Sequence, residues 1–142
     1  MTPEQIQIVR LTLAQATADR LAVECEFYRR LFVIAPDLHA RFRGNVKTEC
    51  IRLQEALALT FGALTDLPFL VATLEALARR GIGRDLSEHH FRALAQSLVG
   101  AVEWRLGAAF TPQVRAAWVG LVTVIVTVLR RPGRAVQRSR AA

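Results

Sequence analysis

Apolar residues recur at every third or fourth position along most of the chain, which is the spacing of one face of an α-helix. The repeat is clearest over residues 53–64 and 91–102. No segment shows the sustained two-residue alternation that is typical of a half-buried strand. The β-branched run 119–128 lies between helix signals, so we predict a buried helix there too. The pattern therefore predicts an all-α protein.

Capping residues, prolines and glycines set the boundaries of these helices. A helix start is predicted wherever a hydroxyl cap precedes a first-turn proline or an apolar repeat, namely at Thr2-Pro3, Ser87 and Thr111-Pro112. Ends are predicted at Ala35-Pro36, at Gly81 and at Pro132-Gly133. The predicted helices cover residues 2–17, 18–34, 48–64, 67–80, 87–106 and 112–131, with one short helical turn at 36–42.

The length of 142 residues and the hydrophobic content of 52% are those of one globular domain with one core. We expect this domain to span residues 1–131. Residues 132–142 form a basic C-terminal tail that is expected to be flexible.

The net charge of +7 is concentrated at the end of the chain. All 12 acidic residues lie at or before Glu103, whereas seven of the 19 basic residues follow it, and all seven are arginines. The preceding part of the chain is balanced in charge. Aromatic residues make up only 7%, too few to suggest a stacking surface for bases. We therefore expect no specific binding of nucleic acid, and a solubilising role for the tail.

Cysteine usage and the absence of a leader pattern predict a cytoplasmic protein. Cys25 and Cys50 form no CxxC pair, and we expect both to be buried thiols in a reducing compartment. The first residues lack the basic-then-apolar pattern of a secretory signal. The most apolar stretch, 116–129, is shorter than the roughly 20 residues that cross a bilayer, and Arg115 and Arg130 close it. No membrane span is expected.

Known catalytic motifs are absent from the sequence. Gly81 and Gly83 follow a predicted helix, which is not the strand-then-glycine arrangement of a phosphate-binding loop. His89 and His90 are adjacent, so on a helix they point about 100° apart and cannot both bind one metal ion. No serine or cysteine has a histidine and a carboxylate at a recognisable spacing. We predict no metal site of this kind and no enzymatic activity.

Several segments nevertheless resemble one known family. They are Phe27-Tyr28-Arg-Arg-Leu31-Phe32 with Ala35-Pro36 and Phe42, Ala56-Leu57-Ala58-Leu59-Thr60, Glu88-His89-His90-Phe91, Leu98-Val-Gly-Ala-Val, and Phe110-Thr111-Pro112-Gln-Val-Arg-Ala-Ala-Trp118. Together they resemble the globins of bacterial single-domain haemoglobins and flavohaemoglobins. The order of the predicted helices also agrees with the globin fold. The resemblance covers residues 1–131 and implies a haem pocket.

The resemblance locates the position that holds the haem iron in the family, and this chain has no histidine there. The proximal histidine of relatives lies nine residues before a His-Tyr or His-Phe step, which corresponds to Gly81 before His90-Phe91. The tyrosine and glutamate that polarise that histidine in relatives are replaced by Phe91 and Gly133. All three proximal partners are therefore changed together.

The distal side of the implied pocket is partly retained. Leu53 stands at the position of the family's usual glutamine, and Leu57 lies on the same distal helix. Tyr28, the other polar distal group, and Phe42, which wedges the porphyrin in relatives, are both present. The resemblance thus implies a vestigial or modified haem pocket formed by Tyr28, Phe42, Leu53, Leu57, Gly81 and Phe91.

Two functional hypotheses follow from this pocket. In the first, the chain is a non-canonical globin without a haem cofactor that serves as a sensor, regulatory or interaction domain. In the second, it binds haem b with altered iron ligation, using His90 or else His89, or leaves the space at Gly81 to water or a small ligand. It would then bind O₂ or another gas. Both hypotheses allow a small apolar or gaseous ligand, and both leave a homodimer open.

Overall fold

The computed structural model describes residues 1–16, 22–38, 55, 58–80 and 86–141, with side chains up to Arg130. Its elements are α1 (Pro3–Ala16), α2 (Ala22–Ile34), α5 (Leu67–Arg79), α6 (Glu88–Leu106), the 3₁₀ turn η1 (Gly107–Ala109) and α7 (Pro112–Ala141). Residues 58–62 are also helical. Every regular element in these ranges is a helix, which confirms the predicted all-α class.

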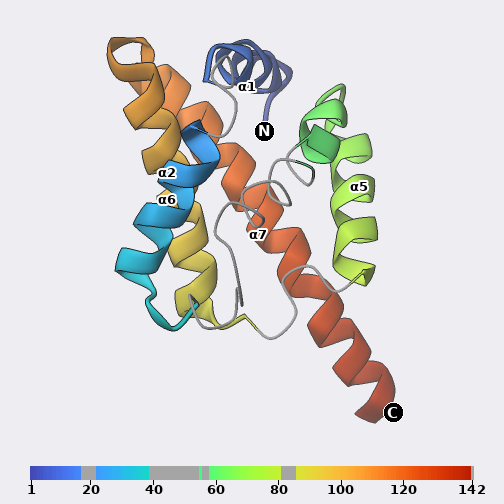
Figure 1. Cartoon of the computed structure of the whole chain (residues 1–142). Coiled ribbons are helices and arrows are strands. Elements are labelled where there is room, and N and C mark those ends of the chain that lie inside the picture. Colours follow the sequence, from blue (N-terminus) through green and yellow to red (C-terminus); the bar gives the residue numbers. More distant parts are fainter. Residues whose placement is uncertain (17–21, 39–54, 56–57, 81–85, 142) are drawn as a thin grey trace.

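The long helix α7 runs through the middle of the fold (Figure 1). On one side of it α2 and α6 pack against each other, and α5 lies on the other side. Helix α1 packs against α7 and α6. Because α7 contacts α1, α5 and α6, it is the element around which the others are arranged.

The predicted helix starts at Thr2, Ser87 and Thr111 are confirmed by hydrogen bonds. Thr2 Oγ1 accepts from the N–H of Gln5 at 3.1 Å, and the N–H of Thr2 donates to Gln5 Oε1 at 3.0 Å. This is the reciprocal arrangement of a capping box. The cap of α5 was not foreseen. There Asp66 Oδ1 accepts from the N–H of Phe69 at 2.8 Å.

Buried side chains from α1, α2, α5, α6 and α7 form one hydrophobic core. Trp118 of α7 is fully buried and is the largest side chain in it. Its Nε1 donates to Thr12 Oγ1 of α1 at 2.9 Å, and its ring meets Phe61 edge-on with centroids 6.1 Å apart. Trp118 thus joins α7 both to α1 and to the helical residues 58–62.

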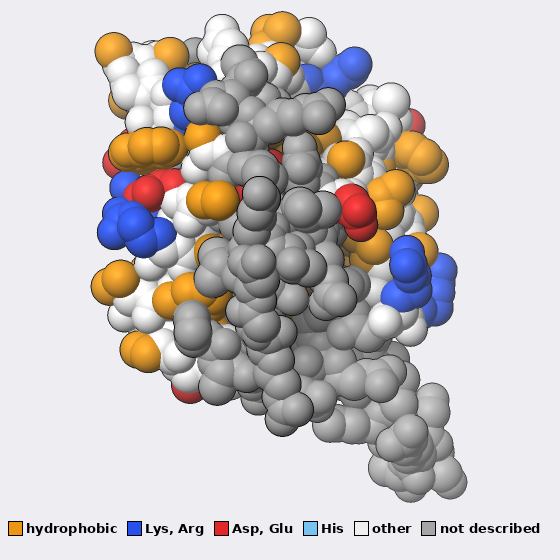
Figure 2. Space-filling view, viewed as in Figure 1, with side chains coloured by type: hydrophobic (Ala, Val, Ile, Leu, Met, Phe, Trp, Pro, Cys, Tyr) orange, Lys and Arg blue, Asp and Glu red, His pale blue; other side chains and the backbone are white. Residues whose placement is uncertain are grey.

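The exposed apolar side chains are spread over the described helices. In Figure 2, hydrophobic and charged side chains are mixed on both sides of the residues that are not described. The large exposed hydrophobic residues are Leu11, Val33, Ile34, Leu59, Phe69, Trp104 and Val119. Apolar residues scattered in this way are normal on a protein surface.

The predicted end of the last helix at Pro132-Gly133 is wrong. Helix α7 continues through both residues to Ala141, and its C-terminal end extends beyond the packed body (Figure 1). Proline removes one backbone hydrogen bond, but its fixed φ is helical, so a helix can continue through it at an energetic cost. The real break lies before this helix, where Gly107 has a φ of 56° that side-chain-bearing residues rarely adopt.

The expectation that the apolar stretch of this helix is too short to cross a membrane also needs correction. The apolar stretch covers Pro112–Arg130, 19 residues, and by length and composition it could span a bilayer. Its buried residues Ala117, Trp118, Leu121, Val122 and Val128 pack in the protein core. The core helix of a globular protein meets the same criterion of length and composition.

Cys25 was predicted to be buried, and it is exposed. The buried face of α2 carries Val23, Phe27 and Leu31, which are spaced by four residues. Cys25 lies instead on the stripe of Arg29 and Val33, which points outward. Cys50 lies outside the described residues.

Candidate functional site

Two of the six predicted pocket residues lie in the described part of the chain. Tyr28 and Phe91 are each buried, on helices α2 and α6 that pack against each other. Phe42, Leu53, Leu57 and Gly81 lie outside the described residues, as does His39. The geometry of the site is therefore built from Tyr28, Phe91 and their neighbours.

Tyr28 belongs to an aromatic group on α2. Its ring meets Phe27 edge-on, with centroids 5.1 Å apart, and lies tilted against Phe32 at 5.8 Å. It is also part of the hydrophobic core. Tyr28, which the family resemblance singled out, thus packs against two aromatic rings in the core, where aromatic pairs of this geometry are favourable.

Phe91 lies below the guanidinium of Arg130. The Cζ atom of Arg130 is 5.7 Å from the centre of the Phe91 ring, a cation–π distance. Nη1 of Arg130 also donates to both carboxylate oxygens of Glu88, at 3.0 and 2.7 Å. A positive group from α7 therefore covers the residue that stands in place of the family's tyrosine. The sequence pattern gave no signal for this contact across 39 residues.

His90 is buried, and both nitrogens of its ring are engaged. Nδ1 accepts from the N–H of Ser87 at 3.2 Å, which completes a capping box at the start of α6. Nε2 lies 2.5 Å from Oδ2 of Asp37. Because Nδ1 accepts and a carboxylate oxygen can only accept, Nε2 is the donor in the contact with Asp37.

His89 differs from its neighbour. It is exposed, and its ring centroid lies 6.1 Å from that of His90. His90, in contrast, is 6% exposed and has partners for both ring nitrogens. Among the described residues, no group of three histidine, cysteine or acidic side chains could hold a metal ion.

The contact with His90 lowers the pKa of Asp37. The hydrogen bond from His90 is the largest cause, and burial opposes it. Because the folded-state pKa is below the ordinary value of 3.8, the contact stabilises the fold above that value. The stabilisation is lost as the pH falls through the lowered pKa.

Replacing Asp37 with asparagine tests this linkage. We expect Asp37→Asn to lower the urea midpoint of unfolding at about pH 5, and the difference from the wild type to vanish as acid protonates Asp37. In a His90→Ala background the same substitution should have no effect, because the partner is absent. An equal loss in both backgrounds would show that Asp37 stabilises the fold by another route.

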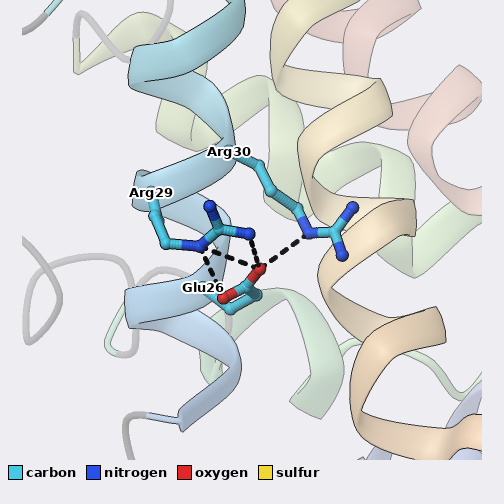
Figure 3. Close-up of polar contacts among 3 residues, drawn as sticks. All are labelled: Glu26, Arg29 and Arg30. Atoms are coloured by element: carbon cyan, nitrogen blue, oxygen red, sulfur yellow. Dashed lines mark hydrogen bonds and ion pairs between the residues drawn. The ribbon is translucent and has the colours of Figure 1, made fainter.

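A charged group on α2, which the sequence analysis did not single out, lies close to α6 (Figure 3). Glu26 accepts from Nη2 of Arg29 at 2.6 Å and from Nε of Arg30 at 3.0 Å. The hydrogen bond from Arg29 is the largest cause that lowers the pKa of Glu26. The spacing of these charges by three and four residues is the sequence signal that could have predicted the group.

Gly100 of α6 makes room for Arg30. A Cβ atom at position 100 would lie 2.7 Å from Nη1 of Arg30, so the end of the arginine side chain would have to shift. The glycine therefore allows the arginine of α2 to lie directly on α6.

The match to known proteins agrees with this fold. Residues 25–129 match the model of the globin family, and the chain belongs to that family. It is 29% identical over 121 residues to a flavohemoprotein of Deinococcus radiodurans and 26% identical over 121 residues to one of Vibrio cholerae. Each match covers 83% of this chain but only 30% and 31% of the relative. The chain therefore spans about a third of the length of these proteins.

Globins normally hold haem, so the described residues can be tested for a fit to it. They supply apolar packing around Tyr28. They do not supply an axial ligand, because both ring nitrogens of His90 are engaged and His89 is exposed. In the part of the chain that the structure describes, the donor set does not fit a protein-ligated iron.

Proposed function

We propose that this chain is a haem-independent globin domain that acts in regulation or in an interaction, as a sensor or binding module in the cytoplasm. The observation that carries the proposal is the double engagement of the His90 ring by Ser87 and Asp37. Gly81, at the position that the family resemblance assigns to the proximal ligand, has no side chain to replace it.

Iron ligation by His90 would require one of two changes. Nε2 would have to leave Asp37, or Nδ1 would have to give up the N–H of Ser87 and with it the cap of α6. Each change breaks one of the two hydrogen bonds, and loss of the bond from Ser87 also removes half of the capping box at the start of α6. The capping function of His90 thus opposes its use as a ligand.

A second function is favoured by the relatives. Both are named flavohemoproteins, and globins normally bind haem. In this alternative the chain holds haem b with altered ligation and binds O₂ or another small gas, without catalysis of its own. A porphyrin buries several hundred Å² of apolar surface, which at about 25 cal/mol/Å² is a stabilisation of several kcal/mol without an iron bond.

The visible spectrum of the purified protein separates the two functions. Under our proposal, protein mixed with haemin and passed through gel filtration emerges without a strong Soret band. A strong band in the untreated protein that survives gel filtration would overturn the proposal. If haem is retained, His90→Ala should weaken it when His90 is the ligand and leave it unchanged when a small molecule fills the space at Gly81.

A further inference from the structure

A hollow of about 160 Å³ lies at the seam between α6 and α7. Its floor is hydrophobic and consists of Phe91, Ala95, Val122 and Val126. Its rim is polar and consists of Arg92, Thr123 and Arg130. The hollow thus combines an apolar floor with a positively charged edge, and it shares Phe91 with the predicted pocket.

Arg130 reaches this rim with donors that Glu88 does not use. Only Nη1 of Arg130 contacts Glu88, although a guanidinium carries five N–H groups. Nε is buried and has no hydrogen-bond partner among the described residues. That nitrogen is enclosed by protein atoms, so a ligand at the rim would meet the terminal nitrogens of Arg130.

Arg92 supplies the second charge of the rim. It is exposed and makes no ion pair with any residue that the structure describes. Thr123 adds no donor, because its hydroxyl already donates to the carbonyl oxygen of Val119 at 2.7 Å. Since Glu88 offsets only one of the two arginines, the rim keeps a net positive charge.

We infer that this hollow binds a small amphipathic carboxylate. The carboxylate head would lie between Arg92 and Arg130, and the hydrocarbon tail would lie along Ala95, Val122 and Val126. Arginine is well suited to a carboxylate because its planar donors match the two oxygens. Binding at this seam does not require haem, so it goes beyond the proposed function and does not depend on it.

The size of the hollow sets the class of ligand. Pockets for drug-sized ligands measure about 300–1,000 Å³, so this one takes a short chain with one charged head. About ten non-hydrogen atoms then give a dissociation constant in the millimolar range. Octanoate has this size and charge and is the probe for the experiment.

The binding test compares four small molecules by amide chemical shifts of the whole chain. Octanoate is expected to shift the amides around Ala95 and Val126. Octanol lacks the charge, octylamine reverses it and acetate lacks the tail, so each should bind at least about tenfold more weakly. Equal binding of octanol and octanoate would show that the arginines take no part, and would overturn the inference.

Three variants locate the site. Arg92→Gln removes a charge that forms no ion pair with a described residue, and it should weaken octanoate binding about tenfold. Ala95→Phe should abolish it by filling the floor. Arg115→Gln is the matched control, because Arg115 is an exposed arginine of α7 that pairs with Glu103 away from the hollow, and it should change nothing. Unchanged binding in Arg92→Gln would overturn the inference.

An anionic lipid membrane also presents negatively charged head groups joined to hydrocarbon chains, so it is the competing ligand. Vesicles of phosphatidylglycerol are therefore added in place of octanoate. Sedimentation of the protein with vesicles, without octanoate shifts at the seam, would assign the arginines to membrane contact and overturn the proposed site. Octanoate shifts that persist in Ala95→Phe would place binding elsewhere and have the same consequence.

Discussion

Replacing Gly81 with histidine is expected to produce a globin that retains haemin through gel filtration, with a strong Soret band. The family resemblance puts position 81 at the proximal ligand, so the substitution supplies the imidazole that the chain lacks. Loss of even the outer partners of a metal ligand changes affinity by about 10–100-fold. We therefore expect Gly81→His to bind haemin at least about a hundredfold more tightly than the wild type, measured by titration of the visible spectrum.

Gly83→His is the matched control for this prediction. It makes the same change of residue type two positions away and should leave haemin binding at the wild-type level. Free imidazole added to the wild type should partly reproduce the Gly81→His spectrum, because it can occupy the same space. If the wild type holds haemin as tightly as Gly81→His, the missing side chain does not limit haem binding.

Replacing Trp118 with alanine is expected to have the largest effect on stability. Trp118 is fully buried, and it donates a hydrogen bond to Thr12 and contacts Phe61 edge-on. Truncation of a large buried aromatic residue costs about 3–5 kcal/mol. Because the free energy of unfolding of a domain is about 5–15 kcal/mol, we expect the melting temperature of Trp118→Ala to fall by about 10 °C or more.

Trp104→Ala tests whether burial is the cause. Trp104 has the same side chain but is 52% exposed on α6, so its loss should change the free energy of unfolding by no more than about 0.5 kcal/mol. The loss of free energy of unfolding in Trp118→Phe should lie between those of Trp104→Ala and Trp118→Ala, because phenylalanine keeps most of the packing and loses the hydrogen bond to Thr12. Equal losses for Trp104→Ala and Trp118→Ala would contradict the central place of Trp118 in the core.

The class of fold and most helix boundaries could be predicted because they depend on neighbouring residues. Thr2, Ser87 and Thr111 cap the backbone only three residues away, and these distances are readable in any sequence. The prediction that the last helix ends at Pro132-Gly133 was wrong, although it also rested on local signals. Proline and glycine disfavour the helix interior without forbidding it, and α7 continues to Ala141.

The candidate site could be predicted less well. Tyr28 and Phe91 were expected in the pocket through the family resemblance, and both are buried. The predictions on Phe42, Leu53, Leu57 and Gly81 remain predictions, because these residues lie outside the described ranges. The partners of the site were missed: Asp37 beside His90 is 53 residues away, and no local pattern indicates such a pair.

The amino-acid order alone determined that this chain folds as helices, where most of them begin, and that position 81 offers no imidazole. These properties follow from the helical period, from caps within one turn, and from the identity of a single residue. Tertiary packing alone decided that Asp37 lies at the ring of His90, that Arg130 covers Phe91, and that Trp118 joins α7 to α1. Such contacts depend on how helices distant in sequence come together, which no local spacing encodes.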